Sequence, residues 1–472
     1  MANHGVRDDG GKRLKTCRMI AGLVGACAFA AMAPDAIHAA PNKATKHTEA
    51  YRSVPMPKGV RVQATELDGP VFADAKGKTL YRWPLRSLRN GPTGDPIGTS
   101  VCTDVRTEVN AGLMSPYPAG LRLPDIDQRP SCTQMWPPFR ADARAKPVGD
   151  WTLIKRNDGT SQWAYKGYAL YTSYLDQRPG DVFGGRADKR SGDSPVMREP
   201  VGPPPDVPPG FAVKTKASGR LLVMEDGASV YSSDQDAPGR SNCEGTCAET
   251  WLPILAPAAG QSHGEWTLIT RAGGLKQWAF RDRPLYKYRL DGEAYKLKGS
   301  DEPGWHNVYT QRAPAPPEGF TVQETTAGQV LADPRGKTIY FYFCGDDAVD
   351  QLGCDHPTQT QTYRLTVCGG GDAERCMRTY EYVVAAPGAK STSRSWSVMT
   401  IDPMTGRIAK AGQPGVLNVW AFRDRPVYTF AADRQPGDAF GDGTGEFRGL
   451  RNGYRAFWLR DDFFNADQPG PG

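Results

Sequence analysis

The chain has 472 residues, enough for about two to four domains of ordinary size. Its 11 tryptophans, 19 tyrosines and 16 phenylalanines exclude a disordered chain, which would be poor in aromatic residues. The net charge of +6 is spread along the sequence, with no dense block of lysine and arginine beyond the first twenty residues, so we expect no nucleic-acid binding.

The first 39 residues have the form of a secretory signal peptide. Basic residues between positions 12 and 18 precede the apolar run 19–33, and small side chains follow up to Ala39. A second interpretation is that LVGAC, which ends at Cys27, is a bacterial lipobox and that Cys27 carries a lipid. Because the apolar run continues beyond Cys27, soluble export is favoured. We therefore expect an exported protein of the periplasm or cell surface, which contacts a membrane only through a lipid anchor.

Three stretches of the chain are nearly the same. In each, a tryptophan is followed eight residues later by a tyrosine and thirteen residues later by an aspartate. Because several anchors keep their order and spacing, we interpret the stretches as internal repeats. The anchors are Trp163, Tyr171 and Asp176, then Trp278, Tyr286 and Asp291, then Trp420, Tyr428 and Asp433.

Each repeat also has a first half that precedes this stretch. It contains a Pro-Gly opening, an acidic turn with a glycine four residues before a tyrosine, and a cysteine followed four residues later by an aromatic residue. Proline-rich joints at 198–211 and 311–320 separate the repeats and are typical of semi-rigid spacers. We therefore predict three tandem domains, each with two similar halves: repeat 1 at residues 55–200, repeat 2 at 207–312 and repeat 3 at 315–465.

The local pattern is β rather than helical. Short segments such as WTLITR and KQWAFRD alternate apolar and polar residues and are separated by tight turns. We predict an all-β protein with about eight strands per domain, in a compact sandwich or barrel. In repeat 2 the pattern places Trp278 and Phe280 on one strand of a hairpin, opposite Tyr286 and Tyr288 on the next. The alternative is a single six-bladed propeller with one half per blade, which the stiff joints argue against.

The cysteines suggest a disulfide framework. Ten are present, and eight remain after the signal peptide, an even number in an exported chain. The insertions between paired cysteines fall in one loop region, where we expect specificity to lie. The alternative is a copper or thiol-redox site at the close pairs, but histidine is too scarce for one ligand set to recur in every repeat. Alignment of the repeats pairs Cys102 with Cys132, Cys243 with Cys247 and Cys368 with Cys376, and leaves Cys344 with Cys354.

These motifs resemble a known bacterial family. GKTLY, C-x-G-x-C-A-x-x-W, QWAFRDRPLYKY and DQRPGDVFGG are similar to the "secreted repeat of unknown function" family, whose members are often labelled lipoproteins with a Yx(FWY)xxD motif. Repeat 1 departs from the motif, with Ser173 in the aromatic position and no aspartate at the expected place after Tyr81. The resemblance implies an extracytoplasmic protein and implies no activity. The motif is present as Tyr286, Tyr288 and Asp291, and as Tyr428, Phe430 and Asp433.

Two features are candidate ligand sites. The motif aromatics could form a stacking platform, but their recurrence in every repeat favours packing between strands. The acidic, glycine-rich loops could bind Ca²⁺, although their spacing matches no EF-hand and repeat 2 lacks the pattern. The carboxylates concerned are Asp176, Asp181, Asp433, Asp438 and Asp442.

Catalytic motifs are weak. Ser194 in the string Gly-Asp-Ser has no histidine within its repeat. We therefore expect a non-catalytic protein without a resident cofactor, with copper and calcium as the weaker alternatives, that binds an envelope protein or glycan through its inserted loops. Two other hypotheses are a periplasmic thiol-redox or copper-handling protein and a hydrolase of envelope glycan, whose carboxylate pair depends on separation in space.

Overall fold

The computed structural model describes residues 48–88, 91–105, 130–184, 198–292, 296–344, 356–359, 361–391, 393–446 and 452–461. The predicted signal peptide, Cys27 and the pairing of Cys344 with Cys354 lie outside what these residues describe, as does most of the insertion between Cys102 and Cys132. From Lys46 onward the chain forms one compact unit. The boundaries of the three domains stay a prediction, and the names repeat 1, repeat 2 and repeat 3 are kept for the three stretches.

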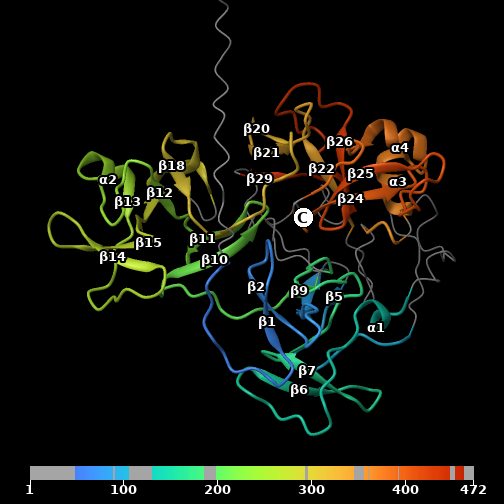
Figure 1. The fold of residues 1–472 in the computed structure, drawn as a ribbon, viewed down its shortest axis with the longest axis horizontal. Coiled ribbons are helices and arrows are strands. Elements are labelled where there is room, and N and C mark those ends of the chain that lie inside the picture. The colour runs from blue at the N-terminus through green and yellow to red at the C-terminus, as the bar shows by residue number, and fades with distance from the viewer. Residues whose placement is uncertain are drawn as a thin grey trace, which may run out of the picture. The chain divides into compact units, whose positions relative to one another are not determined.

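Short strands are the main regular secondary structure of the described chain (Figure 1). Repeat 1 contains β1 (Arg61–Ala64), β2 (Pro70–Ala73), β3 (Tyr81–Arg82), β4 (Arg86–Leu88), β5 (Gly91–Thr93), β6 (Trp151–Lys155), β7 (Ser161–Tyr165), β8 (Tyr168–Ala169) and β9 (Glu199–Pro200). Repeat 2 contains β10 (Phe211–Lys216), β11 (Gly219–Met224), β12 (Tyr231–Ser233), β13 (Trp251–Pro253), β14 (Trp266–Thr270), β15 (Lys276–Phe280), β16 (Arg283–Pro284), β17 (Tyr286–Tyr288), β18 (Trp305–Asn307) and β19 (Tyr309–Arg312). Repeat 3 contains β20 (Thr321–Thr325), β21 (Gly328–Ala332), β22 (Ile339–Cys344), β23 (Tyr380–Tyr382), β24 (Trp396–Ile401), β25 (Leu417–Phe422), β26 (Arg425–Phe430), β27 (Thr444–Glu446), β28 (Asn452–Ala456) and β29 (Trp458–Asp461).

The helices are few and short, as the lack of a 3.6-residue period indicates. A cysteine lies on a short helix in every repeat, and the aromatic residue that follows it ends that helix. In the described part of the chain, no helix has the length and apolar character needed to cross a bilayer. The helices are α1 (Cys132–Met135), α2 (Thr246–Thr250), α3 (Thr362–Gly369) and α4 (Ala373–Thr379), with single 3₁₀ turns at Arg289–Asp291 and Lys298–Asp301.

The all-β prediction is confirmed, whereas the closed alternatives are wrong. The described strands form separate open sheets, and none of these closes into a barrel or joins the others as a propeller. The described repeats have nine or ten strands rather than about eight. The difference arises because very short strands such as β8 and β16 leave almost no alternating pattern in the sequence.

The two halves of each repeat interleave instead of forming separate layers. In repeat 2 the central sheet has the order β13-β17-β12-β18, so strands of the first half alternate with strands of the second. Tyr231 of β12 lies opposite Tyr286 of β17. The corresponding tyrosine of each half pairs in the same way in the other repeats, at Tyr81 with Tyr171 and at Tyr340 with Tyr428.

The hairpin of repeat 2 differs from the prediction. β15 turns back through Arg281 and Asp282, whose φ angles of 50° and 59° are both left-handed, as a two-residue hairpin turn requires. Only Arg283–Pro284 then pairs with β15, and the chain passes into the central sheet as β17. Trp278 and Phe280 therefore lie opposite β14, not opposite Tyr286 and Tyr288. The reason is that β17 finds its partners in β12 and β13.

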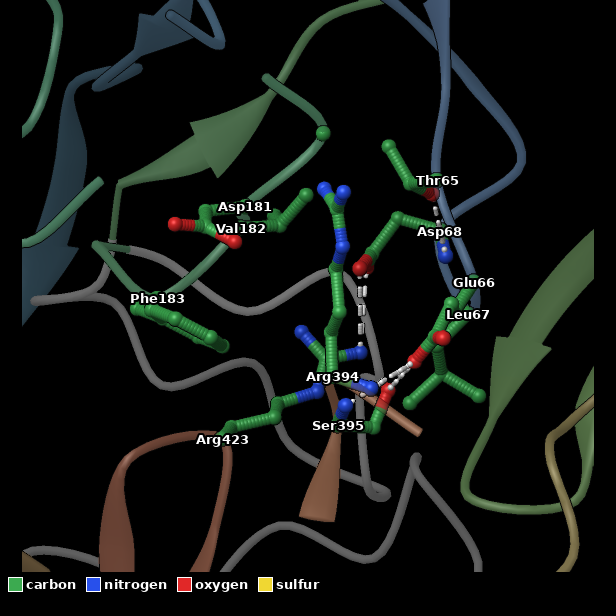
Figure 2. Close-up of a pocket in the computed structure, with 11 residues that line it drawn as sticks. Thr65, Glu66, Leu67, Asp68, Asp181, Val182, Phe183, Arg394, Ser395 and Arg423 are labelled. Carbon is green, nitrogen blue, oxygen red and sulfur yellow. Dashed lines mark hydrogen bonds and ion pairs between the residues drawn. The ribbon is translucent and has the colours of Figure 1, made fainter. Parts of the chain in front are cut away.

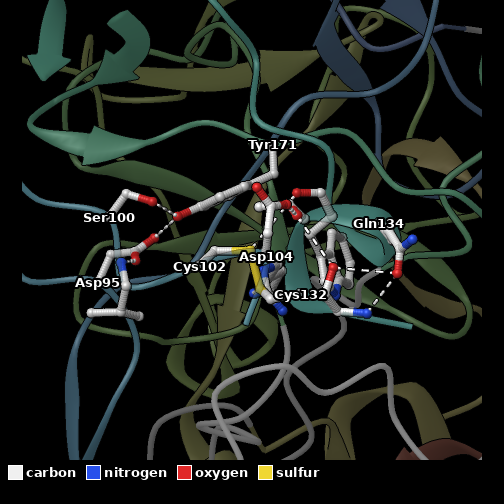
Figure 3. The surroundings of a disulfide bond; sticks show 12 residues. Asp95, Ser100, Cys102, Asp104, Cys132, Gln134 and Tyr171 are labelled. Atoms are coloured by element: carbon white, nitrogen blue, oxygen red, sulfur yellow. Dashed lines mark hydrogen bonds between the residues drawn. A yellow bond between two sulfur atoms is a disulfide. The ribbon is translucent and has the colours of Figure 1, made fainter. Parts of the chain in front are cut away.

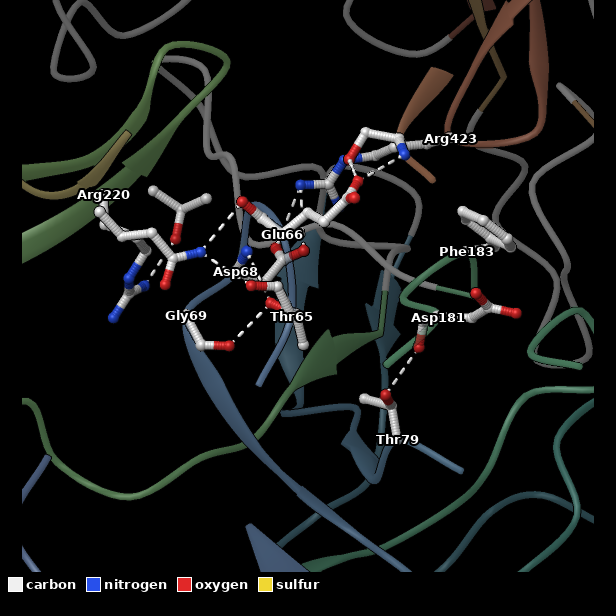
Figure 4. Close-up of polar contacts among 12 residues, drawn as sticks. Thr65, Glu66, Asp68, Gly69, Thr79, Asp181, Phe183, Arg220 and Arg423 are labelled. Atoms are coloured by element: carbon white, nitrogen blue, oxygen red, sulfur yellow. Dashed lines mark hydrogen bonds and ion pairs between the residues drawn. The ribbon is translucent and has the colours of Figure 1, made fainter. Parts of the chain in front are cut away.

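Repeat 1 contacts repeat 3 through the turn between β1 and β2 (Figure 4). The carboxylate of Glu66 accepts hydrogen bonds from the backbone N–H groups of Arg394 and Ser395, at 2.8 and 2.9 Å. The side chain of Leu67 packs into the apolar cluster of repeat 3. Asp68 and Arg423 form an ion pair of 3.1 Å in which both side chains are only 3% exposed. The turn therefore fixes the two repeats to each other.

Repeat 1 and the segment just before it also contact repeat 2. The buried carboxylate of Glu49 accepts two hydrogen bonds from the guanidinium of Arg220, at 2.9 and 2.7 Å. The amide of Gln311 donates to the backbone carbonyls of Thr65 and Glu66, at 2.8 and 3.0 Å. Thus one turn of repeat 1 is held by both of the other repeats.

Removal of the Asp68 carboxylate tests the contribution of this turn. Asp68→Ala leaves the buried guanidinium of Arg423 without its carboxylate, which should lower the free energy of unfolding by about 3–5 kcal/mol. Urea unfolding followed by tryptophan fluorescence measures the change. Asp158→Ala is the control, because its pair with Arg140 is exposed and should contribute much less to stability. Equal losses in the two variants would contradict the buried role of Asp68.

Candidate functional site

The Tyr and Asp of the repeated motif bond across the two halves, not within one half. In repeat 2 the hydroxyl of Tyr231 donates to Oδ2 of Asp291 at 2.7 Å, and the hydroxyl of Tyr286 donates to Oδ2 of Asp236 at 2.8 Å. In the sequence, however, Asp236 follows Tyr231 and Asp291 follows Tyr286, in both cases by five residues. Each half therefore supplies a carboxylate to the tyrosine of the other half.

Repeat 1 has the same two bonds between its halves, although its sequence has no aspartate five residues after Tyr81. Tyr81 donates to Asp176 at 2.7 Å, and Tyr171 donates to Asp95 at 2.7 Å (Figure 3 shows the second pair). The inserted strands β4 and β5 move the aspartate from its usual place after Tyr81 to position 95. A signal for it existed, because Asp95 precedes Cys102 by seven residues just as Asp236 precedes Cys243.

Among the described residues of repeat 3, one of the two bonds is present. Tyr340 donates to Asp433 at 2.6 Å. The ring of Tyr428 lies instead near the guanidinium of Arg364, whose central carbon is 5.6 Å from the ring centre. Arg364 comes from helix α3 and is 1% exposed. Thus a buried cation in repeat 3 takes the place where repeats 1 and 2 have a carboxylate.

Burial raises the pKa values of several carboxylates in this arrangement. Burial raises the pKa of Asp176 to about 7, although hydrogen bonds from the backbone of Phe183 and from the Tyr81 hydroxyl oppose the shift. Burial also raises the pKa values of Asp95 and Asp433. The tyrosines that donate to them stay protonated, because burial and the neighbouring carboxylate raise the pKa values of Tyr81, Tyr171 and Tyr340.

A planar group stacks on the aromatic residue after the cysteine in all three repeats. In repeat 2 the indoles of Trp305 and Trp251 stack with centroids 3.6 Å apart and an angle of 4° between the rings. In repeat 3 Tyr454 and Tyr380 stack at 3.5 Å and 7°. Because β9 continues the register Tyr81–Pro200, the equivalent residue in repeat 1 is Arg198. Its guanidinium lies 4.4 Å from the ring centre of Trp136.

Disulfide bonds close the same region of each repeat. They join Cys102 to Cys132, Cys243 to Cys247 and Cys368 to Cys376. In repeats 1 and 3 a buried guanidinium donates to the second cysteine's sulfur, from Arg198 to Cys132 and from Arg364 to Cys376, both at 3.3 Å. The sulfurs of these two bonds are buried.

The predicted calcium residues serve as turn-forming carboxylates. Asp176 and Asp433 accept hydrogen bonds from the backbone N–H groups of Phe183 and Phe440, at 2.9 and 3.0 Å, besides those from the tyrosines. Asp181, Asp438 and Asp442 also accept bonds from backbone N–H groups. Over the described ranges, no group of three or more His, Cys, Asp or Glu side chains is placed to hold a metal ion. Calcium and copper stay predictions without a supporting cluster.

The motif aromatics lie in the core. Tyr171, Tyr286, Tyr288, Tyr428 and the anchor tryptophans are all buried, and Phe430 is partly buried. Their edges meet one another, for example in the T-shaped contact of Tyr286 with Trp305 at 5.1 Å. The rings are therefore occupied by packing and do not form an open stacking platform.

Among the hollows at the surface of the described residues, two concern repeat 3. A small one, of about 20 Å³, lies where Glu66 and Asp68 meet Arg394, Ser395 and Arg423 (Figure 2). Its volume suits a single water molecule. A larger one, of about 490 Å³, lies beside β23, and its carboxylates, Asp333 and Glu381, both pair with Arg335. Val384, which is 59% exposed, and Leu417 form its apolar side.

Comparison with known proteins supports a secreted-repeat relationship for part of the chain. Residues 152–186 and 418–451 match the model of a family described as "secreted repeat of unknown function". These stretches contain the hairpin, the tyrosine and the acidic loop of repeats 1 and 3. No curated protein and no solved structure matches the chain.

A double-mutant cycle tests the exchange of tyrosine and aspartate between halves. Tyr231→Phe and Asp291→Asn should each lower the free energy of unfolding by about 1–3 kcal/mol, because a buried partner loses its hydrogen bond. Since the two groups bond, their effects should be coupled by more than about 0.5 kcal/mol. The control cycle pairs Tyr231→Phe with Asp236→Asn, which belongs to the same half but bonds Tyr286. Coupling in the control cycle and none in the first would refute the exchange.

The raised pKa of Asp176 predicts a particular dependence of stability on pH. Because the folded pKa of about 7 lies above the ordinary value of 3.8, the folded state holds this proton more tightly. The resulting stabilisation is complete below pH 3.8 and is lost as the pH rises to about 7. Relative to Asp176→Asn, the wild type should therefore lose stability from pH 4 to 7, measured by urea unfolding. Asp158→Asn should show no such difference in this range, since hydrogen bonds from Thr160 lower the pKa of Asp158 to about 2.

Proposed function

We propose that this chain is an exported, non-enzymatic β-repeat protein that binds a protein or glycan of the bacterial envelope. The proposal rests on the location and bonding of the residues that recur between repeats. The tyrosines, aspartates and tryptophans that recur between repeats are buried, most of the tyrosines bond aspartates of the other half, and the recurrent cysteines pair in disulfides. Residues that recur in this way build the fold, and the surface that differs between repeats is left for a partner.

Export is supported by three independent features. The N-terminal sequence has the form of a signal peptide, the cysteines pair in disulfides, and two stretches match a secreted family. We propose the periplasm or cell surface as the location, with a lipid on Cys27 as the alternative to soluble release. The anchors that repeat 2 shares with the two matched stretches support the proposal that it is a third copy of the same family repeat.

The large hollow of repeat 3 is the best described candidate for the binding surface. Its volume of about 490 Å³ is within the range of small-molecule sites. It combines the apolar Val384 and Leu417 with the charges of Arg335 and Glu381, a mixture that suits a polar ligand with an apolar face. Of the insertions between paired cysteines that the sequence favoured, most of the one in repeat 1, at 106–129, lies outside the described residues, whereas the one in repeat 3, at 369–375, joins α3 to α4.

Sedimentation with purified cell-wall glycan tests the proposal. The exported protein should pellet with the glycan without releasing soluble fragments, and Val384→Glu should reduce the bound fraction several-fold by placing a charge in the hollow. Val322→Glu is the matched control, because Val322 is similarly exposed on β20 and does not line the hollow. Release of reducing ends would replace the proposal by the hydrolase hypothesis. Equal binding by both variants would exclude this hollow.

A thiol-redox role is the second candidate, favoured by the two arginines near sulfur. A cation next to a cysteine sulfur stabilises the thiolate formed on reduction, which makes the disulfide easier to reduce. Arg198 and Arg364 occupy such positions beside Cys132 and Cys376. Burial of these sulfurs opposes rapid exchange, so the role requires the region to open.

Equilibration with a dithiol buffer, followed by alkylation and mass spectrometry, tests this second candidate. Arg198→Met should make the Cys102–Cys132 bond harder to reduce, and Arg198→Lys should restore part of the effect because it keeps the charge. The Cys243–Cys247 bond is an internal reference, since neither arginine contacts it in repeat 2. An unchanged midpoint in Arg198→Met would leave the arginine a packing role only.

A further inference from the structure

Repeats 1 and 3 carry an acidic loop of the same conformation. In DQRPGDVFG (176–184) Oδ1 of Asp176 accepts from the N–H of Phe183, and in DRQPGDAFG (433–441) Oδ1 of Asp433 accepts from Phe440. A threonine hydroxyl donates to the carbonyl of the second aspartate in both loops, at 2.7 and 2.6 Å. We call these segments loop 1 and loop 3.

Loop 1 is docked onto repeat 3. The guanidinium of Arg425 donates to the carbonyl of Phe183 at 3.1 Å, and that of Arg394 donates to the carbonyl of Pro179. Just before the loop, the hydroxyl of Tyr174 bonds that of Thr358 at 2.6 Å. Phe183 is partly buried against the apolar cluster of repeat 1 and lines the small hollow together with Arg423 (Figure 2). Loop 1 thus shows how a loop of this kind binds a second repeat.

The receiving element is the tight turn Arg423-Asp424-Arg425 of repeat 3. Its two first residues have left-handed φ angles of 48° and 63°. The same five letters, FRDRP, occur at 280–284 in repeat 2 and at 422–426 in repeat 3. Arg281 and Asp282 have nearly the same φ angles, 50° and 59°. Repeat 2 therefore presents a second turn of the receiving shape.

One loop and one turn remain open to solvent in the described chain. Loop 1 occupies the turn of repeat 3, repeat 1 has Lys166-Gly167 in place of the turn, and repeat 2 replaces the acidic loop by another sequence. Phe440, at the tip of loop 3, is 70% exposed, in contrast to Phe183. Asp282 and Arg283 of the repeat 2 turn are exposed as well, although the guanidinium of Arg283 donates to the Ser233 carbonyl at 3.3 Å and lies 3.8 Å from the carboxylate of Asp234. Because loop 1 docks onto the equivalent turn of repeat 3, we expect loop 3 to fit the turn of repeat 2.

We propose that loop 3 of one molecule docks onto the 281–283 turn of a second copy of this chain. Phe440 would pack against the hairpin, and the guanidinium of Arg283 would donate to the Phe440 carbonyl as that of Arg425 does to the Phe183 carbonyl. The contact joins two different surfaces, so it propagates head to tail into chains or closes into rings. The inference rests on the proposed binding function and narrows its partner to a second copy.

The interface should be weaker than the contact within the chain. Repeat 2 has no counterpart of the Tyr174–Thr358 bond among its described contacts, and Arg281 is already paired with Glu265 at 2.6 Å. An interface of a few side chains corresponds to weak, concentration-dependent association. Association should therefore appear at high protein concentration and with the full exported chain.

Sedimentation velocity of the exported protein over a series of concentrations tests the proposal. The wild type should shift to larger species as concentration rises, whereas Phe440→Ser and Arg283→Glu should each remain monomeric. Both residues are exposed, so near-ultraviolet circular dichroism should show an unchanged fold. Leu275→Ser is the matched control and should associate as the wild type does, because this exposed leucine lies at the other end of the same hairpin.

Mixing the two variants distinguishes this interface from others. Phe440→Ser retains the turn and Arg283→Glu retains the loop, so the mixture should form dimers and no larger species. Dimers in either variant alone, or none in the mixture, would overturn the proposal, as would a wild type that stays monomeric at every concentration. These results are separate from glycan sedimentation, so a monomer that still binds glycan would refute self-association and leave the binding function standing.

Discussion

Each repeat depends on a hydrogen bond between a tyrosine of one half and an aspartate of the other. A carboxylate removed from water must be compensated by donors, and the tyrosine hydroxyl and a loop N–H provide them for Asp176 and Asp433 alike. Since the donor belongs to the other half, neither half keeps its buried carboxylate satisfied alone. The bond therefore explains why the halves interleave and why the minimal folding unit contains both.

The residue beside this bond differs in chemical type between the repeats, although it occupies the same place in the core. Arg198, Trp305 and Tyr454 occupy equivalent places and each lies flat or nearly so against the aromatic residue that follows the cysteine. What the site requires is a planar group that fills the space above a ring. A guanidinium satisfies this through its cation–π attraction, and an indole or phenol through stacking. The cost of burying the cation is reduced by its bond to the disulfide sulfur.

The sequence predicts the parts of the structure that follow from local spacing. The fixed distances from Trp278 to Tyr286 and Asp291 indicate one conserved unit, and alternation indicates strands. It does not predict that the chain changes sheets after Pro284, because the partner of Tyr286 lies in another half. Nor does a motif search find Asp95, since an inserted hairpin moves it away from Tyr81. Its constant distance from the cysteine, which reflects the disulfide-closed loop, is the better marker.

The tight turn in repeats 2 and 3 has residues that rarely adopt its left-handed backbone conformation. Two successive left-handed residues favour Asn-Gly or similar pairs, as in Lys166-Gly167 of repeat 1, whereas an Arg-Asp pair pays about 1–2 kcal/mol per residue in that region. In repeat 3 the cost is offset by contacts with repeat 1, through Asp68 and the Phe183 carbonyl. In repeat 2 only contacts within the repeat, such as Arg281 with Glu265, offset it. The turn of repeat 2 has the same strained backbone conformation as the turn of repeat 3, but it lacks the contacts with repeat 1 that offset the strain there. Such a turn indicates a surface that another molecule can bind.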